Sequence, residues 1–188
     1  MNALEGTVRV VDRTTLPDLR LRAVSVQAVL LAASAIVLPA MAHRLGLPVR
    51  WLLPMHWAVI LSGLTYGSRA GATIGVLAPI LSFLLSGMPL PHIIPAMTLE
   101  LATYGFVAGF ARQILRLSAF ASTAVALGAG RLVFLMLAVA TGAAVPSFST
   151  YLWVALVPGL LAASAQLLLL PPLATWWVRR ESRRQTAA

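Results

Sequence analysis

Two ionisable side chains lie inside long apolar runs, and they are the first candidates for chemistry. Glu100 lies in the run from Pro95 to Leu115, and Arg131 lies near the middle of the run from Ser118 to Thr141. In a membrane, each charge would cost at least about 2.5–3.5 kcal/mol and would need a partner or water. The two runs are joined by a short connection, so we expect antiparallel neighbours that bring Glu100 close to Arg131. Such a pair either locks two helices together or forms the polar part of a ligand site.

Further polar and aromatic side chains lie toward the same predicted end of these runs as Glu100. His56 begins another run, and Tyr104 follows Glu100 by one helical turn. The remaining candidates for a pocket are Trp57, His92, Met97, Phe134 and Tyr151. Tyr151 equally suits an interfacial anchor, and His92 equally suits a solvated loop. A mostly apolar wall with a few placed polar groups is typical of a small-molecule site.

No catalytic or metal-binding motif is visible in the sequence. The three histidines lack ligand-like spacing, and there is no HExxH motif. There is no cysteine, no serine in a GxSxG turn and no phosphate-binding loop. We therefore expect no catalytic residue, no metal site and no cofactor in this chain. A small intramembrane enzyme stays open as an alternative, but it would need a nucleophile and base that the sequence does not reveal.

The composition places these candidate residues in a membrane protein. Of the 188 residues, 60% are hydrophobic and 10% are charged, against about 25% charged in a typical soluble domain. The mean hydropathy is +0.89. The net charge of +9 comes from 14 basic residues, all arginine, most of which flank apolar runs. We attribute this charge to membrane topology and expect no nucleic-acid partner.

Six apolar runs approach the roughly 20 residues that a spanning helix needs. They cover residues 23–42, 52–66, 70–85, 95–115, 118–141 and 150–178, with glycine and proline clusters between them. The sequence thus predicts an all-α integral membrane protein with one six-helix domain at 23–178. Residues 1–22 would form an N-terminal tail, and residues 179–188 a basic C-terminal tail. The runs at 52–66 and 70–85 are short, so they allow tilted, broken or merged spans.

The placement of arginines predicts the orientation of the helices. With the N-terminus in the cytoplasm, 11 arginines fall on the inner side and only Arg44 and Arg50 on the outer side. Because positive charge accumulates in cytoplasmic segments, we expect both termini to be cytoplasmic. Glu100 and its neighbours would then lie toward the outer face.

Five short motifs, most of them between Leu53 and Phe110, carry a family resemblance. They are Pro54-Met55-His56, Gly67-Ser68-Arg69-Ala70-Gly71, Gly87-Met88-Pro89, Glu100-Leu101-Ala102-Thr103-Tyr104-Gly105 and Gly130-Arg131-Leu132-Val133. Together they resemble the substrate-binding S components of energy-coupling factor (ECF) vitamin transporters, in the branch of pantothenate- and cobalamin-type proteins. The pair Trp57-Ala58 departs from the pattern, where an aliphatic residue and proline are expected.

The resemblance implies a transport function. S components are six-helix proteins of prokaryotic cell membranes that bind a water-soluble vitamin near the outer face, under the loops that join the first helix to the second and the third to the fourth. They assemble with a membrane scaffold subunit and two ATPases that use ATP, and they topple in the bilayer to deliver the ligand. Their AxxxA patch for the scaffold maps to Ala28 and Ala32, whose spacing also permits close helix contact. The resemblance favours cobalamin or pantothenate. A non-transport scaffolding protein of the cell envelope is the alternative.

Overall fold

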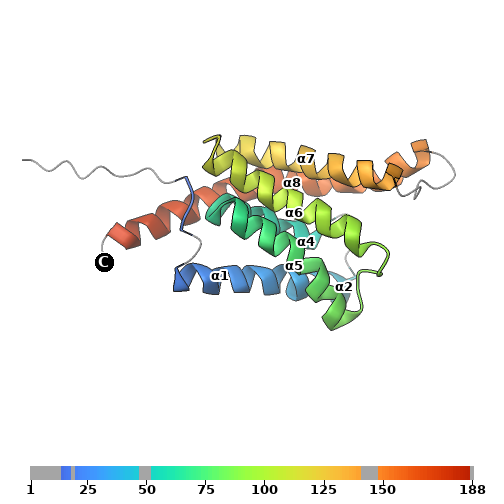
Figure 1. Ribbon diagram of the computed structural model, residues 1–188, viewed down its shortest axis with the longest axis horizontal. Helices are drawn as coiled ribbons and strands as arrows, with labels where there is room; N and C mark the ends of the chain where they lie inside the picture. Colours follow the sequence, from blue (N-terminus) through green and yellow to red (C-terminus); the bar gives the residue numbers. More distant parts are fainter. Residues whose placement is uncertain (1–13, 18–19, 47–51, 141–147, 187–188) are drawn as a thin grey trace, which may run out of the picture.

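The computed structural model describes residues 14–17, 20–46, 52–140 and 148–186, and this part of the chain is helical without strands. Helix α1 (Leu21–Ala32), the π-helical turn η1 (Ala33–Val37) and helix α2 (Leu38–Arg44) run into one another and form the first predicted span. The helices that follow are α4 (Pro54–Tyr66), α5 (Ser68–Ser86), α6 (Ile94–Gln113), α7 (Ala119–Ala140) and α8 (Phe148–Thr186) (Figure 1). The predicted all-α fold is confirmed.

Within the described residues, five helical segments are long and apolar enough to cross a membrane. They are Leu21–Arg44, Ser68–Ser86, Ile94–Gln113, Ala119–Leu137 and Gly159–Arg184. The remaining predicted run forms α4, which has only 13 residues and is shorter than a bilayer core requires. At the C-terminus, α8 continues beyond Val178 to Thr186, so most of the segment expected to be a tail is helical.

One glycine makes the connection between α4 and α5. Gly67 has a φ of 91°, which favours a residue without a side chain. Helix α5 begins directly after this glycine at Ser68, so both Arg69 and Gly71 lie in the first turn of that helix.

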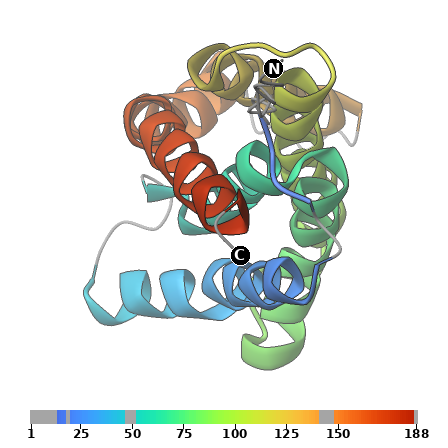
Figure 2. The same ribbon diagram turned by 90° about the vertical axis from the view of Figure 1, so that its left-hand side faces the viewer.

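The helices α4, α5 and α6 pack backbone against backbone through glycines. A Cβ atom at Gly105 of α6 would collide with the backbone of Gly71 in α5, and one at Gly63 of α4 would collide with the Gly105 carbonyl. Glycine permits this close approach, which is a common way for membrane helices to associate. α6 is therefore fixed between α4 and α5, with α1 on one side of this trio and α7 and α8 on the other (Figures 1 and 2).

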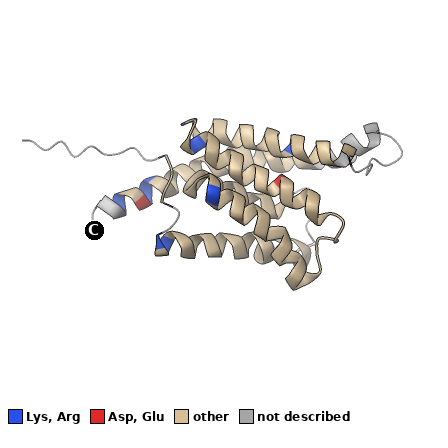
Figure 3. Ribbon diagram, in the orientation of Figure 1, with Lys and Arg blue, Asp and Glu red and all other residues tan. Residues whose placement is uncertain are grey.

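Residues 14–17 lie against the ends of α4 and α6. The backbone N–H of Leu16 donates to the Thr65 carbonyl at 2.7 Å, and Arg112 Nε donates to the Thr14 carbonyl at 3.1 Å. Leu16 is buried. These contacts lie at the end of the bundle where most of the described arginines gather (Figure 3). This is the end that the sequence predicts to be cytoplasmic.

Candidate functional site

Glu100 lies in the interior of the bundle and is the centre of a polar cluster. The residue is only 4% exposed. Its Oε1 accepts a hydrogen bond from the Tyr104 hydroxyl at 3.1 Å and lies 3.6 Å from Nη1 of Arg131. The same oxygen lies 3.8 Å from Nε2 of His56. Side chains from α4, α6 and α7 thus converge on one carboxylate, and the expected approach of Glu100 and Arg131 is present.

His56 is the member of this cluster with unused hydrogen-bonding groups. Its side chain is buried, and its ring packs edge-on against Tyr104 with the ring centroids 5.1 Å apart. Neither ring nitrogen has a hydrogen-bond partner among the described residues. The 3.8 Å separation from Glu100 is too long for a hydrogen bond. Since buried polar groups are almost always hydrogen-bonded, the ring of His56 has hydrogen-bonding capacity that the described residues do not use.

Two glycines make room for the larger members of the cluster. A Cβ at Gly159 of α8 would collide with the guanidinium of Arg131, and one at Gly130 would lie 2.6 Å from the ring of Tyr104. The guanidinium also lies over the ring of Phe134, 5.5 Å from its centroid, where a cation is attracted by the aromatic face. Arg131 can therefore occupy this position because Gly159 in α8 has no side chain.

We expect Gly159→Ala to destabilise the protein by displacing Arg131 from Glu100. The matched control is Gly128→Ala on α7, where a Cβ meets nothing within 4 Å. Both changes gain about 1 kcal/mol of helix propensity, so the control should be neutral or stabilising. Thermal unfolding in detergent should show that the free energy of unfolding of the Gly159 variant is roughly 1–2 kcal/mol lower than that of the control. In an Arg131→Ala background the two variants should be equally stable, and a difference that persists there would contradict the explanation.

Several predicted pocket residues have other contacts. Trp57 donates its indole N–H to the Leu52 carbonyl at 2.8 Å, and this hydrogen bond links the first turn of α4 to the residues just before it. Met97 is half-buried and packs against the apolar core. His92 is exposed in the turn before α6, and no described contact joins it to Glu100. The side chain of Tyr151 lies outside the described residues.

The predicted partner-binding residues lie on an open face of the first helix. Ala28 and Ala32 are both exposed on α1. Large apolar side chains of the same span are also exposed, among them Val29 at 66% and Ile36 at 44%. Their role in binding a partner stays a prediction.

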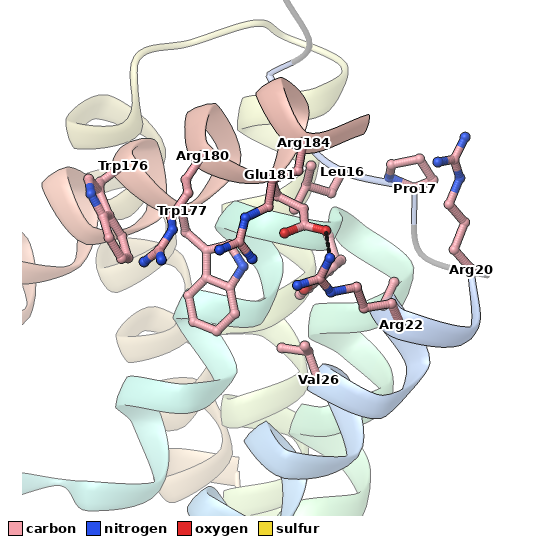
Figure 4. Close-up of a pocket in the computed structure, with 12 residues that line it drawn as sticks. Leu16, Pro17, Arg20, Arg22, Val26, Trp176, Trp177, Arg180, Glu181 and Arg184 are labelled. Atoms are coloured by element: carbon pink, nitrogen blue, oxygen red, sulfur yellow. Dashed lines mark ion pairs between the residues drawn. The ribbon is translucent and has the colours of Figure 1, made fainter. Parts of the chain in front are cut away.

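Sequence reasoning missed two features of the bundle. The first is Gly159, for which the only signal was a Pro-Gly pair inside a long apolar run. The second is a cavity of about 720 Å³ at the Arg-rich end, between the start of α1 and the last turns of α8 (Figure 4). The sequence showed arginines there but gave no sign that residues so far apart would surround a common space.

Comparison with known proteins gives one match. The family model described as "ECF transporter, substrate-specific component" matches residues 24–174. This range includes the whole polar cluster around Glu100 and extends from the first turn of α1 to Ala174 within α8. No curated protein and no solved structure matches the chain.

Proposed function

Because the chain belongs to the family of ECF transporter substrate-specific components, we propose that it captures a water-soluble vitamin at the polar cluster around Glu100. As a member of this family it is a multi-pass membrane protein that binds a substrate for transport. The vitamin enters from the outer face, and the resemblance to pantothenate- and cobalamin-type S components favours cobalamin or pantothenate. The protein would work in a prokaryotic cell membrane with both termini in the cytoplasm.

The observation that carries this proposal is the buried ring of His56, which has no hydrogen-bond partner among the described residues. Beside it lie the carboxylate of Glu100, the phenol of Tyr104 and the guanidinium of Arg131. A ligand would therefore meet hydrogen-bond donors and an acceptor within an apolar surround, as small-molecule sites generally provide. The carboxylate of pantothenate would pair with Arg131, whereas the amide groups of cobalamin would use His56 and Tyr104.

Energy for transport would come from partner subunits. We assign ATP hydrolysis to two ATPases, and we expect the chain itself to need no cofactor. A membrane scaffold subunit would dock on the face of α1 that carries Ala28 and Ala32, where the small side chains allow a helix to approach closely. Toppling of the whole bundle would then carry the ligand inward.

Native mass spectrometry of the purified protein tests the vitamin-binding role. We expect a stoichiometric vitamin-sized mass that is released on denaturation and is absent from the Glu100→Ala variant. The identity of the released compound would name the substrate. An empty protein that no member of a vitamin panel stabilises against heat would contradict the proposal. That result would favour the alternative of a membrane scaffolding protein.

Bulky side chains on α1 should separate docking from ligand binding. We expect the double variant Ala28→Trp, Ala32→Trp to reduce copurification with the scaffold subunit at least about tenfold, since close helix contact needs small residues. Its thermal stabilisation by the vitamin should match that of the unmodified protein. Ala124→Trp, at an exposed alanine on α7, is the control and should assemble normally. Normal assembly of the double variant would show that the scaffold docks elsewhere.

A further inference from the structure

The cavity at the Arg-rich end lies between the N-terminal part of the described chain and the last turns of α8. Its wall includes Pro17 and the first turns of α1, Tyr66 at the end of α4, and the segment of α8 that contains Trp177. Its volume of about 720 Å³ falls within the usual range of ligand sites, roughly 300–1,000 Å³. Figure 4 shows basic and aromatic side chains from α1 and α8 around the same space. It lies at the opposite end of the bundle from the starts of α4 and α6, near which the Glu100 cluster is found.

The lining of this cavity carries an excess of positive charge. Four guanidinium groups and one carboxylate line it, and they belong to Arg20, Arg22, Arg180, Arg184 and Glu181. Arg22 pairs with Glu181 at 3.1 Å. No other ion pair among the described residues involves these arginines. The charge that is left unbalanced favours an anion.

The start of α1 adds to the attraction for an anion. The cavity is lined by Arg22 and Ala23, which belong to the first turn of this helix. Arg20 occupies the N-cap position and makes no side-chain hydrogen bond there, and no other described side chain caps this helix. Unpaired backbone N–H groups and the positive end of the helix dipole favour phosphate groups at such a position.

The surroundings favour a lipid over a freely dissolved anion. Trp176 is 53% exposed, and the guanidinium of Arg180 lies 5.1 Å from the centroid of its ring. Tryptophan beside arginine is typical of the boundary between headgroups and acyl chains. Large apolar side chains next to the cavity are exposed as well, among them Leu21 at 85% and Leu173 at 41%. A lipid whose headgroup enters the cavity would have apolar surface for its acyl chains on both helices.

We propose that this cavity binds the phosphate headgroup of an anionic phospholipid from the adjacent leaflet. Basic pockets between membrane helices on the cytoplasmic side are suited to such headgroups. The lipid would bridge the start of α1 and the end of α8. This site is independent of the vitamin-binding role, because it uses none of the residues around Glu100.

Two double variants on the same helix test the lipid site. Arg180→Gln with Arg184→Gln removes two charges from the cavity wall, whereas Arg179→Gln with Arg183→Gln removes two exposed charges that do not line it. The proteins are placed in nanodiscs of phosphatidylcholine with a minor fraction of phosphatidylglycerol, and the retained lipids are counted by native mass spectrometry. We expect the cavity variant to lose at least about tenfold in phosphatidylglycerol retention, and the control variant to behave like the unmodified protein.

Other outcomes would overturn the proposal. An equal loss in both variants would indicate general attraction of lipid to a basic surface. Inorganic phosphate or glycerol phosphate that binds the detergent-purified protein and displaces the lipid at millimolar concentration would assign the cavity to a soluble anion. If the unmodified protein shows no preference for phosphatidylglycerol, the cavity does not bind an anionic lipid. An acidic segment of a partner protein would then be the ligand to test. Circular dichroism and a monodisperse elution profile must first show that both variants are folded.

Discussion

Replacing Glu100 by alanine is expected to lower the affinity for the transported ligand by at least about tenfold. The carboxylate accepts a hydrogen bond from the Tyr104 hydroxyl and lies 3.6 Å from Nη1 of Arg131, so its loss leaves both side chains without this partner. Removing one partner of a fully buried ion pair costs about 3–5 kcal/mol in stability. Because the side chain of Arg131 is 21% exposed, we expect a smaller loss of about 2–3 kcal/mol here.

A second variant separates weak binding from poor folding. Glu100→Gln keeps the shape of the side chain and can still accept the hydrogen bond from Tyr104, so its unfolding temperature should fall less than that of the alanine variant. Its ligand affinity, measured by calorimetry on the folded fraction, should still fall because the negative charge is gone. Unchanged affinity in Glu100→Ala would remove this residue from the binding site.

The largest effect on stability is expected from Gly105→Val. A Cβ at this position collides with the backbone of Gly71, and a branched side chain adds two further methyl groups to the same contact. Since backbone cannot move aside as a flexible side chain can, α5 and α6 would have to separate. We expect a cost at or above the upper end of the usual range for overpacking, about 3 kcal/mol. Thermal unfolding and the monodisperse yield in detergent both measure it.

The control for this change is Gly128→Val on α7. A Cβ atom there meets nothing within 4 Å, so the substitution tests valine in a helix without the backbone collision. The control should keep a near-normal unfolding temperature. An equally normal temperature for Gly105→Val would mean that α5 and α6 lie farther apart than the structure places them.

The helices could be predicted because the bilayer imposes a simple rule on the sequence. A spanning helix needs a long apolar run, and the helices found lie close to the predicted runs. The sequence predicted a span that ends at Val178, whereas α8 continues as a helix to Thr186, because hydropathy marks where the membrane ends and not where the helix ends. Arginine, glutamate and glutamine follow Val178, and these residues continue a helix readily in water.

The candidate site was only partly predictable, for a geometric reason. Glu100 and Tyr104 are four residues apart and therefore share one face of α6. Trp57 follows His56 by one residue, so it lies about 100° farther round α4 and does not share the direction of His56. Depth in the membrane can be read from the sequence, but direction around a helix has to be derived from spacing. The space that Gly159 leaves for Arg131 comes from packing between helices, which no local pattern reveals.

The unequal lengths of α4 and α8 have a mechanical consequence. At 1.5 Å per residue, the 13 residues of α4 extend about 20 Å, and residues 148–178 of α8, which precede its charged end, extend about 46 Å. The hydrocarbon core is about 30 Å thick, so one helix is too short for it and the other too long. Such hydrophobic mismatch is relieved by thinning the bilayer beside the short helix and by tilting the long one. A protein that rests tilted in a locally thinned membrane would have less far to rotate in the toppling movement proposed above.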